Sequence, residues 1–79
     1  MTNKQIRQIK AKYETKPGYI LDLSRKEFEI LFEDALDIEV FEEYEGPSVG
    51  KTFTSFLKNA SQDQINVIIT ELDKRVMQG

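Results

Sequence analysis

Apolar side chains recur at helical spacing in four stretches of the 79-residue chain. Spacings of three and four residues place such side chains on one face of a helix, which then faces the core. The pattern predicts helices over about 3–14, 24–36, 48–59 and 61–78. The clearest apolar stripe lies in the last of these: Ile65, Ile68, Ile69, Leu72 and Val76.

Helix starts are marked by residues whose side chains bind free backbone amides. Ser24–Glu27 and Ser61–Gln64 are capping boxes, in which a serine caps the helix and a Glu or Gln three residues later binds back. Ser48 is a further candidate cap, and either Thr2 or Asn3 caps the first helix. These signals support the predicted helix boundaries.

The segments between the helices are short. Pro17 and Gly18 end the first helix, since proline cannot continue it and glycine permits a turn. The next segment alternates apolar with polar or outward positions, which predicts an extended piece too short to form a sheet. Its inward-facing residues would be Tyr19, Leu21 and Leu23. A single helical turn is expected near Phe41–Tyr44.

These elements predict one all-α domain over residues 1–79. We expect a compact bundle of four main helices plus a short helical turn. About two residues separate the last two helices, so the chain should end in a tight αα-hairpin.

Composition narrows the possible chemistry. The chain contains no cysteine and no histidine, which removes thiolate chemistry, the commonest metal ligand and the usual proton shuttle at neutral pH. We therefore expect a non-enzymatic protein with no cofactor and no metal. The N-terminus is polar and no apolar run could cross a bilayer, which favours a cytoplasmic protein.

Charge is distributed unevenly along the chain. Residues 1–26 carry a net charge of +5, residues 27–45 carry −9, and residues 46–79 carry +1. The acidic run is either an ordinary solvated surface or a face that meets a basic partner. Four of its residues are our candidate partner-binding positions: Glu39, Glu42, Glu43 and Glu45.

The segment "GPSVGKTFT", residues 46–54, is similar to a nucleotide-binding phosphate loop. Such a loop needs four residues between its glycines, whereas three separate Gly46 from Gly50. The acidic segment before it is not a buried strand and would repel phosphate. We therefore expect no nucleotide, but a turn at Gly46 and Pro47 followed by a helix that Ser48 caps.

Other chemical readings of the charged residues are weaker. The carboxylates match neither a glycosidase pair with one raised pKa nor the ligand pattern of an EF-hand. A basic side formed by Lys4, Arg7 and Lys10 could touch nucleic acid, but one short basic face on an acidic protein is a poor signal.

Residues 18–57 resemble the small N-terminal helical domain of bacterial abortive-infection-like proteins, which are associated with phage defence. The resemblance rests on a Gly-Tyr-x-Leu-Asp-x-Ser segment, an aromatic-rich helix and a Gly-x-Ser segment with a following helix. The matched residues are Gly18, Tyr19, Leu21, Asp22, Ser24, Phe28, Ile38, Tyr44, Gly46, Ser48, Lys51, Phe56 and Leu57.

The resemblance implies a defence or mobile-element setting and no catalytic residue. The family is strongly basic after the serine, whereas this chain has Val49, Thr52 and Thr54 there and retains only Lys51. Lys51 is therefore a further candidate partner-binding residue.

Two hypotheses of function follow. The first is a protein-interaction or adaptor domain linked to phage defence or its regulation, acting through a protein partner or a homo-oligomer. The alternative is an inhibitor encoded by a phage or mobile element, which would block a host protein with its acidic face.

Overall fold

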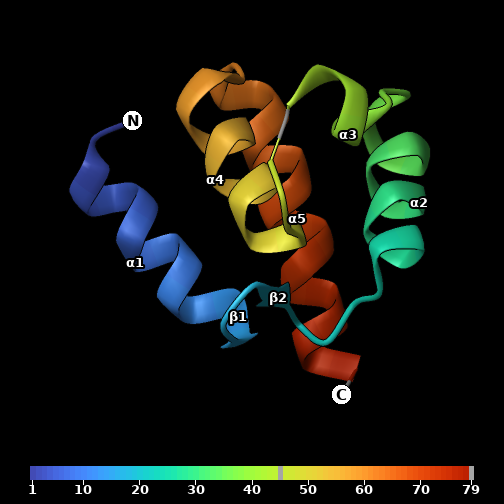
Figure 1. Ribbon diagram of the computed structural model, residues 1–79, viewed down its shortest axis with the longest axis horizontal. Coiled ribbons are helices and arrows are strands. Elements are labelled where there is room, and N and C mark those ends of the chain that lie inside the picture. The colour runs from blue at the N-terminus through green and yellow to red at the C-terminus, as the bar shows by residue number, and fades with distance from the viewer. Residues whose placement is uncertain (45, 79) are drawn as a thin grey trace.

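The computed structural model describes residues 1–44 and 46–78 and is predominantly helical, as the sequence predicts (Figure 1). Within these residues, four main helices are joined by a small hairpin and one short helical turn. In chain order the elements are α1 (Asn3–Tyr13), β1 (Glu14–Lys16), β2 (Tyr19–Ile20), α2 (Arg25–Leu36), α3 (Val40–Glu43), α4 (Val49–Asn59) and α5 (Gln62–Gln78).

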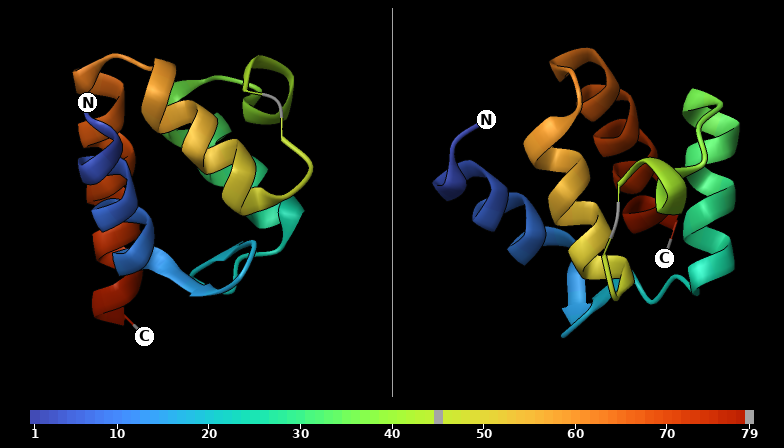
Figure 2. Two further views of the ribbon diagram at one scale, coloured as in Figure 1. Left: turned by 60° about the vertical axis from the view of Figure 1, so that its left-hand side comes forward. Right: turned by 45° about the horizontal axis from the view of Figure 1, so that its top comes forward.

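Helix α4 runs through the middle of the molecule, with α1 on one side and α3 on the other (Figures 1 and 2). Helix α5 makes its most extensive contacts with α2. Helix α1 makes its most extensive helix contacts with α4. The connection between α4 and α5 is two residues long, as expected. Even so, α5 packs mainly on α2, a contact between segments far apart in sequence.

The predicted helix starts are confirmed in atomic detail. Thr2, rather than Asn3, caps α1 and forms a capping box with Gln5. Ser24 caps α2 together with Glu27, and the Ser61–Gln64 box begins α5. Hydrogen bonding of the Glu27 carboxylate by the Ser24 backbone amide, and then by the Ser24 side chain, holds the pKa of Glu27 below its usual range. Each box satisfies amides that have no partner within the helix.

The segment after α1 differs from the prediction. Glu14 and Lys16 pair with Ile20 and Tyr19 in a two-stranded antiparallel hairpin, where the sequence indicated no sheet. The expected inward alternation is wrong at its first position, because Tyr19 is 47% exposed while Ile20 is fully buried. Leu23 is buried as expected, and Leu21 is partly buried against the core. Leu21 and Asp22 adopt left-handed backbone angles, with φ of 51° and 58°. This turn breaks the two-residue period on which the prediction relied.

The core is rich in aromatic rings contributed by different elements. Phe28 on α2 lies 4.7 Å from Phe32, 5.7 Å from Phe41 and 6.2 Å from Phe53, measured between ring centroids. Phe56 on α4 joins the cluster through Phe32. A second predicted core position is also wrong, because the C-terminal end of the α5 stripe lies outside the core. The other residues of that stripe are buried or half-buried, but Val76 is 48% exposed.

Candidate interaction surfaces

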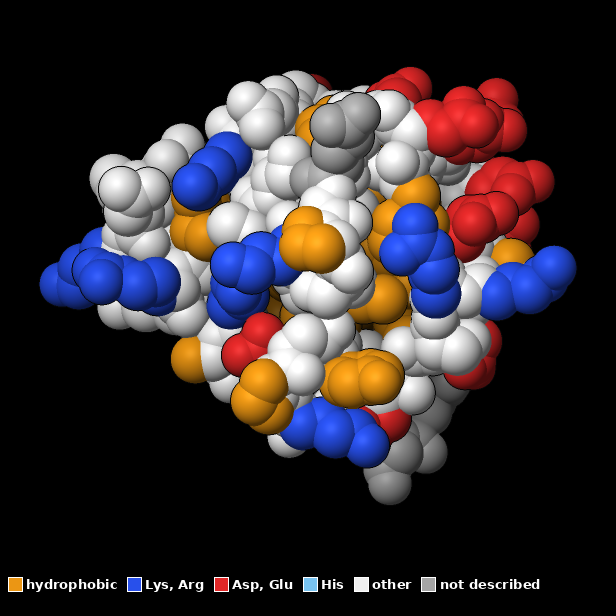
Figure 3. Space-filling view, viewed as in Figure 1, with side chains coloured by type: hydrophobic (Ala, Val, Ile, Leu, Met, Phe, Trp, Pro, Cys, Tyr) orange, Lys and Arg blue, Asp and Glu red, His pale blue; other side chains and the backbone are white. Residues whose placement is uncertain are grey.

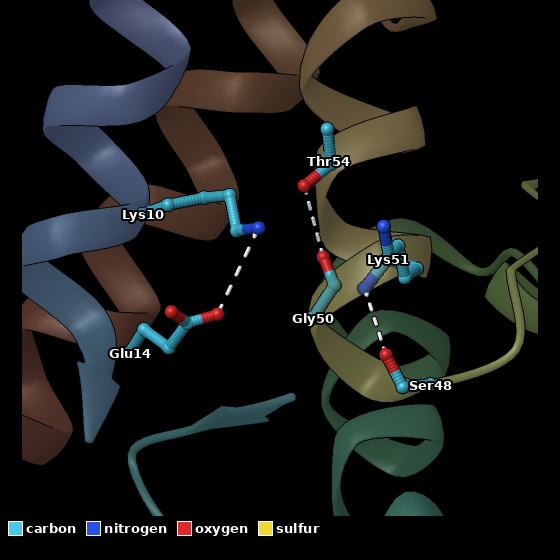
Figure 4. A network of polar contacts seen from close by, with 6 residues as sticks. All are labelled: Lys10, Glu14, Ser48, Gly50, Lys51 and Thr54. Atoms are coloured by element: carbon cyan, nitrogen blue, oxygen red, sulfur yellow. Dashed lines mark hydrogen bonds and ion pairs between the residues drawn. The ribbon is translucent and has the colours of Figure 1, made fainter. Parts of the chain in front are cut away.

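The segment around Gly46 and Gly50 forms a turn and a capped helix start. The Ser48 hydroxyl accepts a hydrogen bond from the Lys51 amide at 3.2 Å (Figure 4). The Gly50 amide donates to the Gly18 carbonyl in the hairpin turn at 3.1 Å. A phosphate loop would offer such amides to a ligand. Here both are bound to groups of the protein, which supports the interpretation as a turn and helix cap.

The close approach of α4 to the hairpin explains the glycine at position 50. A Cβ at Gly50 would lie 3.2 Å from the Gly18 Cα and 3.2 Å from Glu14 Oε2. Gly18 itself has a φ of 84°, which favours glycine. The two glycines therefore allow the start of α4 and the hairpin turn to pack backbone against backbone.

The start of α4 does not present the surface that the resemblance implies. Val49 is 7% exposed and Thr52 is fully buried, so both point into the core rather than toward a partner. Thr54 is half-buried, and its hydroxyl donates to the Gly50 carbonyl at 3.0 Å. The lack of charge at positions 49 and 52 thus reflects packing. Lys51 is exposed on the first turn of α4.

Carboxylates gather on one exposed surface formed by α2, α3 and the segment between them (Figure 3). Phe41 and Ile38 supply the apolar part of two shallow recesses there. We call the carboxylates that line these recesses the acidic surface: Glu29, Glu33, Asp37, Glu39, Glu42 and Glu43.

The acidic surface is crowded with like charge. A hydrogen bond with the Glu42 carboxyl, together with its negative charge, raises the pKa of Glu39 above its usual range. The ion pairs of the described residues lie elsewhere, on α1, β1 and α5. One cation beside this surface is Arg25, whose guanidinium lies 3.9 Å from the centroid of the Phe41 ring and so stacks on an apolar side chain. The surface therefore carries concentrated negative charge that its own chain leaves largely unpaired.

The structure brings three of the five candidate partner-binding residues together. Glu39, Glu42 and Glu43 lie on the acidic surface. Glu45 lies outside the described residues. Lys51 lines neither acidic recess, so it belongs to a different part of the surface.

Basic residues collect on the other side of α4. A groove between α1 and α4 is floored by Ile6, which is 4% exposed, and edged by Arg7, Lys10 and Lys58. Asn3 and Thr54 complete its lining. Figure 3 shows Lys and Arg side chains over α1 and α4, away from the main group of carboxylates. We call this feature the basic groove.

The sequence predicts two of the three cations of the basic groove. The side formed by Lys4, Arg7 and Lys10 was recognised as basic, and Arg7 and Lys10 line the groove. Lys58 stands about fifty positions later and joins them only because α1 packs on α4. The sequence pattern of α1 or of α4 alone does not predict that Lys58 lies beside Arg7 and Lys10.

A polar contact fastens the end of α1 to α5. The Tyr13 side chain is 1% exposed, and its hydroxyl donates a hydrogen bond to Asp73 Oδ1. Lys12 Nζ lies 3.2 Å from the same oxygen. Burial, and then the bond to Asp73, raises the pKa of Tyr13. The bonds from Tyr13 and Lys12 hold the pKa of Asp73 below its usual value.

We expect Tyr13→Phe to raise the pKa of Asp73 toward the ordinary aspartate range, because the main donor to its carboxylate is removed. A group with a lowered folded pKa stabilises the fold above its unfolded value and loses that contribution as the pH falls through the folded value. The stability difference between wild type and variant should therefore be present at neutral pH and shrink in acid. Carboxyl NMR titration and denaturation at several pH values would measure both. An unchanged Asp73 titration would contradict the contact.

Within the described residues, no three carboxylates are placed so that they could hold a metal ion together, and no helix is long and apolar enough to span a membrane. What the molecule offers instead is two charged surfaces on either side of α4. No family model, curated protein or solved structure matches the chain.

Proposed function

We propose that the chain is a non-enzymatic protein-interaction domain, whose partner is another protein or a second copy of itself. One observation carries the proposal: the acidic surface and the basic groove are exposed, oppositely charged and separated by α4. Surfaces of this kind select partners by complementary charge and speed their encounter. The resemblance of residues 18–57 further suggests a role in bacterial phage defence, with the protein acting in the cytoplasm.

The acidic surface is the main recognition element of this proposal. Its carboxylates are crowded, and its recesses contain the apolar side chains of Phe41 and Ile38. An interface needs an apolar centre as well as charge, and these two side chains provide one. A partner with Lys or Arg side chains around a small apolar contact would fit this surface.

Capture from a native bacterial lysate tests the proposal. Glu39→Lys/Glu42→Lys/Glu43→Lys should lose the proteins that the wild-type domain retains, because the attraction becomes repulsion. A matched control is Asp34→Lys/Asp63→Lys/Glu71→Lys, whose three carboxylates line neither acidic recess. The control should retain the same proteins. Thermal melting should confirm that both variants are folded.

Retention of the same proteins by all three forms would refute the role of the acidic surface. A wild-type domain that neither retains a protein nor associates with itself would refute the proposed function as a whole.

The same surface supports a second candidate, an inhibitor that covers a basic or nucleic-acid site on a host protein. Its support is the crowding of Glu39 and Glu42, since closely spaced carboxylates can imitate a run of phosphates. Under this candidate, nucleic acid should compete with the domain for the captured protein. Capture that is unaffected by added nucleic acid would favour the adaptor role.

A further inference from the structure

The basic groove has the features of a docking site for an acidic segment. Its floor is the side of Ile6, and its edges are cations from two helices. Lys10 is partly neutralised by Glu14, whose Oε2 lies 3.7 Å from its Nζ (Figure 4). Arg7 and Lys58 take part in none of the ion pairs formed among the described residues. These two cations remain available to carboxylates from outside.

The best complement to the groove within the described structure is the molecule's own acidic surface. That surface has excess carboxylates and a small apolar centre, whereas the groove has excess cations and an apolar floor. The raised pKa of Glu39 shows that crowding opposes its charged form, and an incoming cation would relieve that crowding.

The two surfaces cannot meet within one molecule. Helix α4 stands between them, contacting α1 on the groove side and α3 on the acidic side (Figures 1 and 2). A contact between them must therefore join two chains. Each chain would use a different surface, which makes the contact heterologous and leaves one free surface at each end of a dimer.

We propose that the chain associates head to tail with copies of itself, the acidic surface of one copy docking in the basic groove of the next. The inference rests on the proposed function and names its partner. A heterologous contact that does not close into a ring continues into a chain, so assembly grows with concentration. Because charge drives it, the association weakens as salt screens the surfaces.

Two neutralising variants test the proposal without reversing any charge. Arg7→Gln/Lys58→Gln removes the two free cations of the groove and leaves the acidic surface intact. Glu39→Gln/Glu42→Gln/Glu43→Gln removes three carboxylates of the acidic surface and leaves the groove intact. Sedimentation equilibrium would give the molecular mass at increasing protein concentration. At ~20 mM salt the Debye length is about 20 Å, so the attraction between the two surfaces is only weakly screened.

The wild type should form dimers and larger species, with an association constant at least about tenfold lower at ~0.3 M salt. Each variant alone should remain a monomer. An equimolar mixture of the two should form a one-to-one dimer and nothing larger, because one intact groove meets one intact acidic surface. A control with the same charge change, Lys16→Gln/Lys74→Gln, alters exposed lysines outside the groove and should assemble like the wild type.

A wild type that stays monomeric at ~0.5 mM and low salt would overturn the inference, since the two surfaces would then bind each other with a Kd weaker than about 1 mM. A mixture that stays monomeric while the wild type assembles would also overturn it. The inference would also be overturned if the protein did not self-associate but its groove bound a labelled single-stranded oligonucleotide, with the binding lost in Arg7→Gln/Lys58→Gln. If self-association fails but charge reversal still abolishes capture of another protein, the proposed function survives and this inference does not.

Discussion

Replacing Phe28 by alanine is expected to lower the free energy of unfolding by about 3–5 kcal/mol, the usual cost of deleting a buried phenylalanine. Phe28 is fully buried and contacts rings from α2, α3 and α4. A chain of 79 residues has a total stability of about 4–12 kcal/mol at typical values per residue. The variant should therefore lose a large part of its stability, and if the wild type lies at the low end of that range, near about 4–5 kcal/mol, the variant should be substantially unfolded.

Urea denaturation followed by far-UV circular dichroism measures this effect. Ile30→Ala is the matched control, because Ile30 is on the same helix but 43% exposed. It should cost under about 1 kcal/mol, as surface substitutions usually do. Equal losses in the two variants would show that Phe28 does not hold the three helices together.

Gly46→Ala is expected to have the second largest effect, a loss of about 1–3 kcal/mol typical of overpacked sites. A Cβ at this position would lie 2.6 Å from the Thr52 backbone nitrogen and 2.8 Å from the Lys51 carbonyl carbon. Both are backbone atoms of α4, so the helix start itself would have to move. The loss follows from packing and requires no ligand at this segment.

Gly50→Ala provides the comparison within the same segment. Its Cβ would meet the movable carboxylate of Glu14 and the Gly18 backbone, each at 3.2 Å. Alanine also gains about 1 kcal/mol of helix propensity over glycine, which offsets the tighter contact. We expect stability within about 1 kcal/mol of the wild type, measured by the same denaturation. A larger loss in Gly50→Ala than in Gly46→Ala would contradict the geometry described for this turn.

Local signals explain why most of the fold could be predicted. A capping box such as Ser24–Glu27 acts within four residues, so its sequence determines its structure without reference to the rest of the chain. Phe28 lies directly after that box, at helical spacing from Leu31 and Phe32, and all three side chains are buried. The hairpin was missed because its strands are two and three residues long and the left-handed turn at Leu21 and Asp22 leaves no periodic pattern.

The acidic surface could be predicted from the sequence more fully than the basic groove. The acidic surface is built largely from one continuous run, and Glu39, Glu42 and Glu43 are close in sequence as well as in space. The basic groove needs Lys58 beside Arg7, and this depends on the packing of α1 on α4. The burial of Val49 and Thr52, by contrast, fits the local helical spacing, because each lies four residues before a buried phenylalanine of α4, Phe53 or Phe56. The basic groove could not be read from the pattern of a single helix.

Site-specific photo-crosslinking in cells that naturally encode this protein would test the proposed interaction most directly. A photoreactive residue would replace Glu42 on the acidic surface, and in a matched protein it would replace Lys74, which is exposed on α5. We predict a discrete protein adduct from position 42 that is absent from position 74. Mass spectrometry of the adduct would then identify another protein or a second copy of this chain. No adduct from position 42, or the same adducts from both positions, would contradict a role for the acidic surface in binding a partner.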